Sequence, residues 1–112
     1  MELKFRVWDN VDRMSTFTLK DLHDGKIQFT DDCPVMQFTG MKDSKNKEIC
    51  ESDIIYWKNG AMSGEAIIKR AAGHFYLSGY PFEENGMLNE SFFKKCTKII
   101  GHIYKGNNST TH

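Results

Sequence analysis

The sequence lacks any excess of charge, any long apolar run and any regular spacing of cysteines. Its 15 lysine and arginine residues balance 15 aspartate and glutamate residues, so no overall field attracts the chain to nucleic acid or to an anionic membrane. The longest apolar runs fall far short of the roughly 20 residues that span a bilayer. Residues 1–5 contain no apolar segment of the signal-peptide kind. We therefore expect a cytoplasmic protein without a membrane partner.

The sequence also lacks a recognisable catalytic or metal-binding motif. Cys33, Cys50 and Cys96 are an odd number at wide spacing, which describes neither a disulfide framework nor a zinc site, and we expect reduced thiols. The acidic stretch at residues 43–48 fails as a calcium loop, because lysines stand where oxygen ligands are needed. Phosphate-binding glycine loops and nucleophile motifs are absent. We expect no metal, no cofactor and no enzymatic activity.

What is present is a composition typical of a small globular protein. The chain has 112 residues, of which 39% are hydrophobic and 27% charged. This length supports one compact domain and is too short for two well-buried cores. We expect a single domain over residues 1–105, followed by a flexible tail at residues 106–112 that is rich in asparagine, serine and threonine.

Alternation of apolar and polar residues predicts a series of short strands. The Asn59-Gly60 pair predicts a tight hairpin between two of them. Residues 15–22 fit either a short helix or a continued strand, and Asn89 is placed to cap a single helical turn that reaches Lys95. The predicted strands are residues 3–8, 13–17, 26–30, 35–39, 54–57, 64–69, 74–77 and 97–104.

Short strands separated by glycine or Asn-Gly turns favour a mainly β fold with small α content. We expect short antiparallel strands that form an N-terminal β unit over residues 1–41. A connecting loop at residues 42–52 then leads to a small SH3-like barrel over residues 53–105. Barrels of this kind support unrelated functions, so the fold alone predicts none.

Lysines and aromatic residues offer one candidate binding surface. Aromatic rings stack on bases and lysines bind phosphates, so nucleic acid is a possible partner, although interleaved acidic residues and the zero net charge weaken this interpretation. The same aromatic residues, with six methionines, are also suited to a homo-oligomer or partner surface. The candidate residues are Lys42, Lys45, Lys47, Tyr56, Trp57, Tyr76 and Tyr80.

Three stretches of the chain together resemble the YopX family of small proteins encoded by phages and prophages. They are KFRVWD at residues 4–9, MQFTGMKD through KEICESDI over residues 36–54, and IIGHIY at residues 99–104. The resemblance implies a mainly β fold, a bacterial host cell and a homo-oligomer. It implies no reaction, because the family offers no established activity to carry over.

This sequence departs from the family pattern at four positions. Asn46 and Ser52 stand where the family usually has glycine, Cys50 replaces an aromatic residue, and His102 replaces asparagine. Asparagine tolerates a positive φ angle in a turn. Serine tolerates a positive φ angle less well, so Ser52 is the departure with the largest expected effect on the backbone.

The motif residues favour an architectural role over a binding role. Thr39-Gly40 is typical of a turn out of a strand, and the carboxylate of Asp53 is placed to accept backbone hydrogen bonds where the barrel begins. The candidate structural residues are Trp8, Thr39, Gly40, Glu48, Asp53 and Gly101.

Three functional hypotheses remain open at this point. The first is a non-enzymatic phage accessory protein that binds a host or phage protein, for example in counter-defence. The second is a nucleic-acid-binding β-barrel. The third is a protein that binds a small ligand or nucleotide at an oligomer interface.

Overall fold

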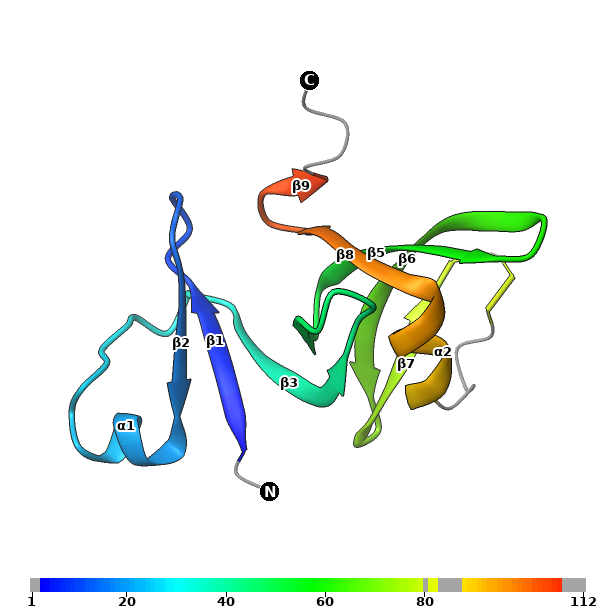
Figure 1. Cartoon of the computed structure of the whole chain (residues 1–112). Coiled ribbons are helices and arrows are strands. Elements are labelled where there is room, and N and C mark those ends of the chain that lie inside the picture. Colours follow the sequence, from blue (N-terminus) through cyan, green and yellow to red (C-terminus); the bar gives the residue numbers. More distant parts are fainter. Residues whose placement is uncertain (1–2, 80, 83–87, 108–112) are drawn as a thin grey trace. The chain divides into compact units, whose positions relative to one another are not determined.

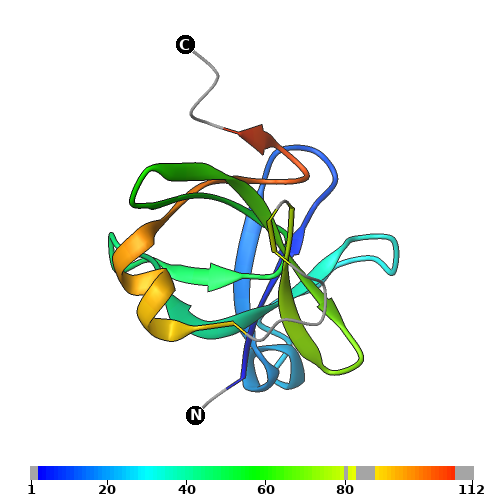
Figure 2. The ribbon, with the colours of Figure 1, turned by 90° about the vertical axis from the view of Figure 1, so that its right-hand side faces the viewer.

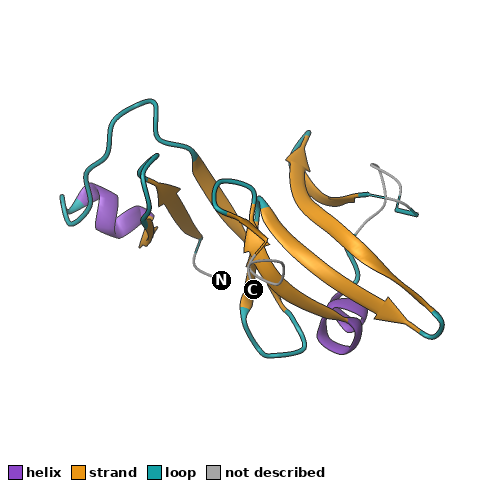
Figure 3. Cartoon of the chain, turned by 90° about the horizontal axis from the view of Figure 1, so that it is seen from above, coloured by secondary structure: helices purple, strands orange, loops and turns teal. Residues whose placement is uncertain are grey.

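The computed structural model describes residues 3–79, 81–82 and 88–107, and most of them are in strands (Figure 1, Figure 3). This confirms the predicted mainly β fold. Among these residues, no helix is long and apolar enough to cross a membrane. The strands are β1 (Lys4–Trp8), β2 (Met14–Thr18), β3 (Val35–Lys42), β4 (Glu48–Cys50), β5 (Asp53–Asn59), β6 (Met62–Ala71), β7 (His74–Ser78), β8 (Thr97–His102) and β9 (Gly106–Asn107), and the helices are α1 (Leu19–His23) and α2 (Glu90–Cys96).

The chain divides into two compact units, residues 1–38 and residues 39–112. The division falls within β3, a few residues before the end of the N-terminal unit predicted at residue 41. Residues 42–52 do not form a separate connecting loop. They belong to the second unit and include β4, whose Ile49 and Cys50 are fully buried.

The first unit is built on an antiparallel hairpin of β1 and β2, with β3 pairing on the other side of β1. The turn of the hairpin is organised by Asp9, whose carboxylate accepts hydrogen bonds from the backbone amides of Val11, Asp12 and Arg13 at 2.8, 2.9 and 3.0 Å. These bonds, with that from Arg13 the largest cause, hold the pKa of the Asp9 carboxyl below its usual value.

After β2 the chain turns into the short helix α1. The side chain of Thr18 accepts from the amide of Asp21, and the Asp21 carboxylate accepts from the amide of Thr18, which forms a capping box. The prediction of a strand at residues 26–30 is wrong, because that segment is irregular. Its alternation instead reflects the half-buried Ile27 and Phe29, and the Phe29 ring packs on Phe17 at 5.5 Å between centroids.

The second unit contains a five-stranded antiparallel sheet with the order β7-β6-β5-β8-β9 (Figure 1, Figure 2). β5 and β6 form the hairpin that the Asn59-Gly60 pair predicts, and Gly60 has a φ of +65°. The predicted closure into a barrel is not confirmed, since this order begins and ends at separate edges. β9 pairs with β8 through residues 106 and 107, so these two residues are not part of an unstructured tail. Residues 108–112 lie outside the described part of the chain.

One hydrophobic cluster forms the core of the second unit. The face of the sheet that carries Ile55 and Trp57 packs against Phe93 of α2, the helix that Asn89 caps through a bond from the amide of Phe92. Gly64 leaves room for the indole ring of Trp57, because a Cβ atom there would lie 3.2 Å from it. The buried members of the cluster are Ile49, Ile55, Trp57, Ala66, Ile68, Leu77 and Phe93.

Candidate functional site

The aromatic residues of the predicted binding surface do not form one surface. Trp57 is a core residue with only 4% of its surface exposed, and its ring meets Phe82 edge-on at 5.2 Å. The prediction that Trp57 takes part in binding is therefore wrong. Alternation along β5 explains why Trp57 and its neighbour Tyr56 do not share a surface, because neighbouring residues of a strand point to opposite faces of the sheet. Tyr56 consequently lies on the outer face, where it is partly exposed.

The other predicted binding residues lie in separate places. Tyr76 is half-buried on the outer face of the sheet, opposite Lys69 of β6. Tyr80 lies outside the described residues. The predicted lysines are all exposed, at the end of β3 and in the turn between β3 and β4; they are Lys42, Lys45 and Lys47.

The turn between β3 and β4 is organised by a carboxylate that the sequence did not single out. Asp43 is fully buried. Its Oδ1 accepts from the amides of Lys45 and Lys47, both at 2.9 Å, and its Oδ2 accepts from the amide of Ile99 in β8 at 2.9 Å. The amide of Ser44 also donates to the carbonyl oxygen of Thr97 at 3.0 Å. The lysine-bearing turn is thereby fixed to β8, which is a structural role.

A second buried carboxylate organises the corner between β4 and β5. Asp53 is 2% exposed, and its Oδ2 accepts from the amide of Cys50 at 2.8 Å. Ser52 has a φ of +75°, in the left-handed region that favours glycine. Its amide donates to the carbonyl of Ile68 at 2.7 Å, and its carbonyl accepts from the amide of Ile103 at 3.0 Å. The corner is therefore fixed to β6 and to the turn after β8.

The remaining predicted structural residues are parts of the framework. The hydroxyl of Thr39 donates to the carbonyl of Ile49 at 2.9 Å and accepts from the amide of Met41. Gly40 does not end β3, which continues to Lys42. Trp8 is buried at the end of β1, Glu48 begins β4, and Gly101 pairs with Ile54 beside the register shift between β5 and β8.

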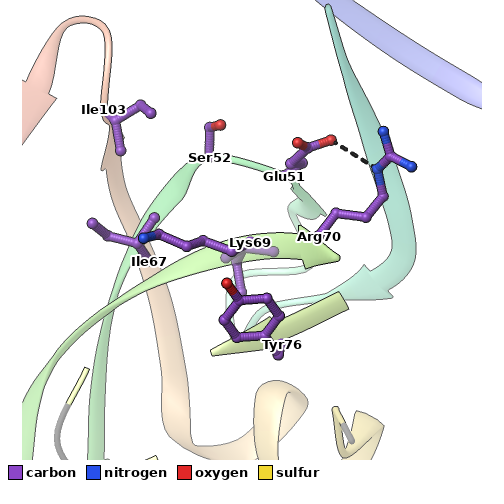
Figure 4. A pocket seen from close by; sticks show the side chains of 8 residues that line it. Glu51, Ser52, Ile67, Lys69, Arg70, Tyr76 and Ile103 are labelled. Carbon is purple, nitrogen blue, oxygen red and sulfur yellow. Dashed lines mark hydrogen bonds and ion pairs between the residues drawn. The ribbon is translucent and has the colours of Figure 1, made fainter. Parts of the chain in front are cut away.

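The outer face of the second unit carries a pocket of about 390 Å³. Figure 4 shows its walls, which come from the β4–β5 corner, β6, β7 and the turn after β8. Arg70 donates from Nε to the carboxylate of Glu51 at 3.3 Å. We call this site the sheet pocket; its lining residues are Glu51, Ser52, Ile67, Ile68, Lys69, Arg70, Tyr76 and Ile103.

The first unit carries a surface of a different kind. Leu19, Leu22 and Val35 are 54%, 44% and 43% exposed. They surround aromatic rings, of which Phe5 and Phe17 stack at 5.7 Å between centroids. The hollow between these side chains has a volume of about 140 Å³ and is lined by apolar residues alone. We call this surface the apolar face; its residues are Phe5, Phe17, Leu19, Leu22, Phe29 and Val35.

Sequence reasoning missed most residues of both sites. Leu19 and Leu22 are three residues apart, a spacing that places them on one side of α1 and was the available signal for the apolar face. Of the sheet pocket, only Tyr76 belonged to the predicted binding surface. The available signal was the alternation of Ile67 and Lys69 with the buried Ala66 and Ile68, which places both side chains on the outer face of β6.

Comparison with known proteins gives a family and a fold. A family model described as YopX protein matches residues 8–109. Among solved structures, the chain is similar to the crystal structure of protein EF1440 from Enterococcus faecalis, with 21% sequence identity and a TM-score of 0.63. That similarity covers 92% of this chain and 94% of the other and concerns the fold. Comparison with curated proteins gave no match.

Proposed function

Because the chain belongs to the YopX family, we propose that it is a phage or prophage accessory protein without enzymatic activity. It acts by binding another protein, of the host or of the phage, through the apolar face of its first unit. Counter-defence against the host is the kind of role that such binding serves.

The observation that carries this proposal is the exposure of large aliphatic side chains around an aromatic floor. Leu19, Leu22 and Val35 are each more than 40% exposed although they lie next to one another around an apolar hollow. Contiguous exposed apolar surface of this kind marks interaction sites in soluble proteins, whereas scattered exposed apolar residues do not. The aromatic floor is also consistent with an interface centre, because such centres are enriched in aromatic residues.

The test is a variant that changes the apolar face and leaves the fold in place. Leu19→Glu combined with Leu22→Glu places two carboxylates on the exposed side of α1. Val11→Glu is the matched control, because Val11 is an exposed aliphatic residue in the β1–β2 turn and does not line the hollow. Tagged forms are used to recover partners from phage-infected host cells, and each recovered partner is purified and its Kd measured by calorimetry.

We expect the double variant to weaken binding by about tenfold or more, as the loss of interface anchors does, while Val11→Glu binds like the wild type. A partner that binds all three forms equally would contradict the proposal, and so would the absence of any partner. Light scattering of the pure protein identifies the case in which the partner is a second copy, because the double variant then lowers the measured mass.

A further inference from the structure

The sheet pocket is held in shape by the backbone. The amide of Ser52 donates to the carbonyl of Ile68 in β6, and the amide of Ile103 donates to the carbonyl of Ser52. The β4–β5 corner is thus hydrogen-bonded to two other walls of the pocket, β6 and the turn after β8. The fourth wall, β7, pairs with β6, and this places Tyr76 directly opposite Lys69. With a volume of about 390 Å³, the pocket falls in the range of preformed small-molecule sites.

The charges around the sheet pocket do not cancel. Its lining holds two cations, Lys69 and Arg70, and one carboxylate, Glu51. Because Glu51 accepts from Arg70, that ion pair leaves the ammonium of Lys69 in excess. Within the described part of the chain, no carboxylate forms an ion pair with Lys69. An anionic group beside the ammonium of Lys69 gains a charge-assisted hydrogen bond from it.

Hydroxyl and apolar groups complete the chemistry of the sheet pocket. Lys69 extends beside Ile67, with Ser52 and Ile103 on the other side of the pocket (Figure 4). The hydroxyl of Tyr76 lies next to Lys69, since side chains directly opposite on paired strands are neighbours. The site thus combines one excess cation and the hydroxyl of Tyr76 with the aliphatic side chains of Ile67 and Ile103.

We propose that the sheet pocket binds a small organic anion with an apolar part. Its carboxylate or phosphate group lies against the ammonium of Lys69 and the hydroxyl of Tyr76, and its apolar part packs on Ile67 and Ile103. This site lies in the second unit and is independent of the apolar face, so either proposal can fail without the other.

The experiment uses sodium hexanoate as the probe, with the full chain observed by amide chemical shifts in NMR. We expect saturable shifts at residues 51–52, 67–70, 76 and 103. Lys69→Gln, which removes the charge and keeps much of the side-chain length, is expected to raise the Kd about tenfold, the loss of one hydrogen bond to a charged group. Lys98→Gln is the matched control, because Lys98 is an exposed lysine on the same sheet outside the pocket.

Two further probes test the chemistry of the ligand. Hexanamide keeps the chain length and lacks the charge, and inorganic phosphate keeps the charge and lacks the apolar part, so we expect both to bind more weakly than hexanoate. The proposal is overturned if hexanoate causes no saturable shift or if the shifts lie elsewhere. It is also overturned if hexanamide or phosphate binds as tightly as hexanoate, or if Lys98→Gln weakens binding as much as Lys69→Gln.

Discussion

At the scale of single residues, two departures from the family pattern fall at left-handed backbone positions. Asn46 has a φ of +65° and Ser52 a φ of +75°. Both residues carry a Cβ atom that crowds the backbone in this region, but the side-chain amide of asparagine can offset that cost by local hydrogen bonds, which the serine hydroxyl does more weakly. Ser52 therefore holds a strained conformation, which the two backbone hydrogen bonds of its corner maintain.

Replacing Ser52 by glycine is expected to stabilise the protein. Ser52→Gly removes the left-handed strain, and after the entropy of glycine in the unfolded chain is subtracted we expect the free energy of unfolding to rise by about 0.5 to 1 kcal/mol. Ser63→Gly is the control, since Ser63 is an exposed residue within β6, where glycine lowers stability by roughly 0.5 to 1 kcal/mol. Urea denaturation measures both. Equal destabilisation by the two substitutions would show that Ser52 is not strained.

At the scale of the elements, the turn between β3 and β4 depends on Asp43. Asp43→Ala leaves the amides of Lys45, Lys47 and Ile99 without their acceptor. These three hydrogen bonds are partly buried, and an unsatisfied buried group costs about 1 to 3 kcal/mol, so we expect the free energy of unfolding to fall by roughly 3 kcal/mol.

The substitution Asp43→Asn tests the contributions of the two carboxylate oxygens separately. Its remaining oxygen can still accept from the amides within the turn, but its NH₂ group cannot accept from Ile99. We therefore expect a loss smaller than that of Asp43→Ala. Ser44→Ala is the control, because the side chain of Ser44 is exposed and its backbone bond to Thr97 is retained. A loss in Asp43→Ala no larger than in Ser44→Ala, measured by thermal or urea unfolding, would contradict this role.

The same elements show what the sequence could predict. The Asn59-Gly60 hairpin and the cap at Asn89 were predicted because each depends on residues close together in the chain. The role of Asp43 was missed because one of its partners lies 56 residues away. The strand at residues 26–30 was predicted wrongly because packing of an irregular segment on Phe17 produces the same alternation as a strand.

The candidate sites were less predictable than the fold. The walls of the sheet pocket come from four segments between residues 51 and 103, and no local pattern indicates that they meet. Trp57 and Tyr56 were grouped together because both are aromatic, although alternation along β5 places them on opposite faces.

The family was predictable because its three motifs are each short and continuous, and the match over residues 8–109 confirms it.

At the scale of the whole molecule, the two units differ in how much apolar surface they bury. The core cluster that includes Ile55, Trp57 and Phe93 lies entirely within residues 39–112. The first unit has 38 residues, of which Val7, Trp8, Phe17 and Met36 are its buried apolar side chains among those described. Chains below roughly 40 residues seldom fold alone without a metal, disulfide or partner.

This difference predicts how fragments of the chain behave. We expect a fragment of residues 39–112 to unfold cooperatively on heating, because it contains its whole core, and a fragment of residues 1–38 to show no cooperative transition. Circular dichroism during thermal unfolding measures both, with the full chain as the reference. A cooperative transition in the shorter fragment, or none in the longer one, would contradict this expectation.

The Asp43 carboxylate binds residues both near to it and far from it in the chain, and this bears on the order of folding. Its bonds to Lys45 and Lys47 close loops of a few residues, which chains do within about 100 ns. Its bond to Ile99 joins residues that are 56 positions apart in the chain, and closing this larger loop carries a larger entropic cost. We therefore expect the turn to form early with one carboxylate oxygen still hydrated, and that oxygen to lose its water when β8 pairs. On this expectation, a single side chain takes part in both an early and a late step of folding.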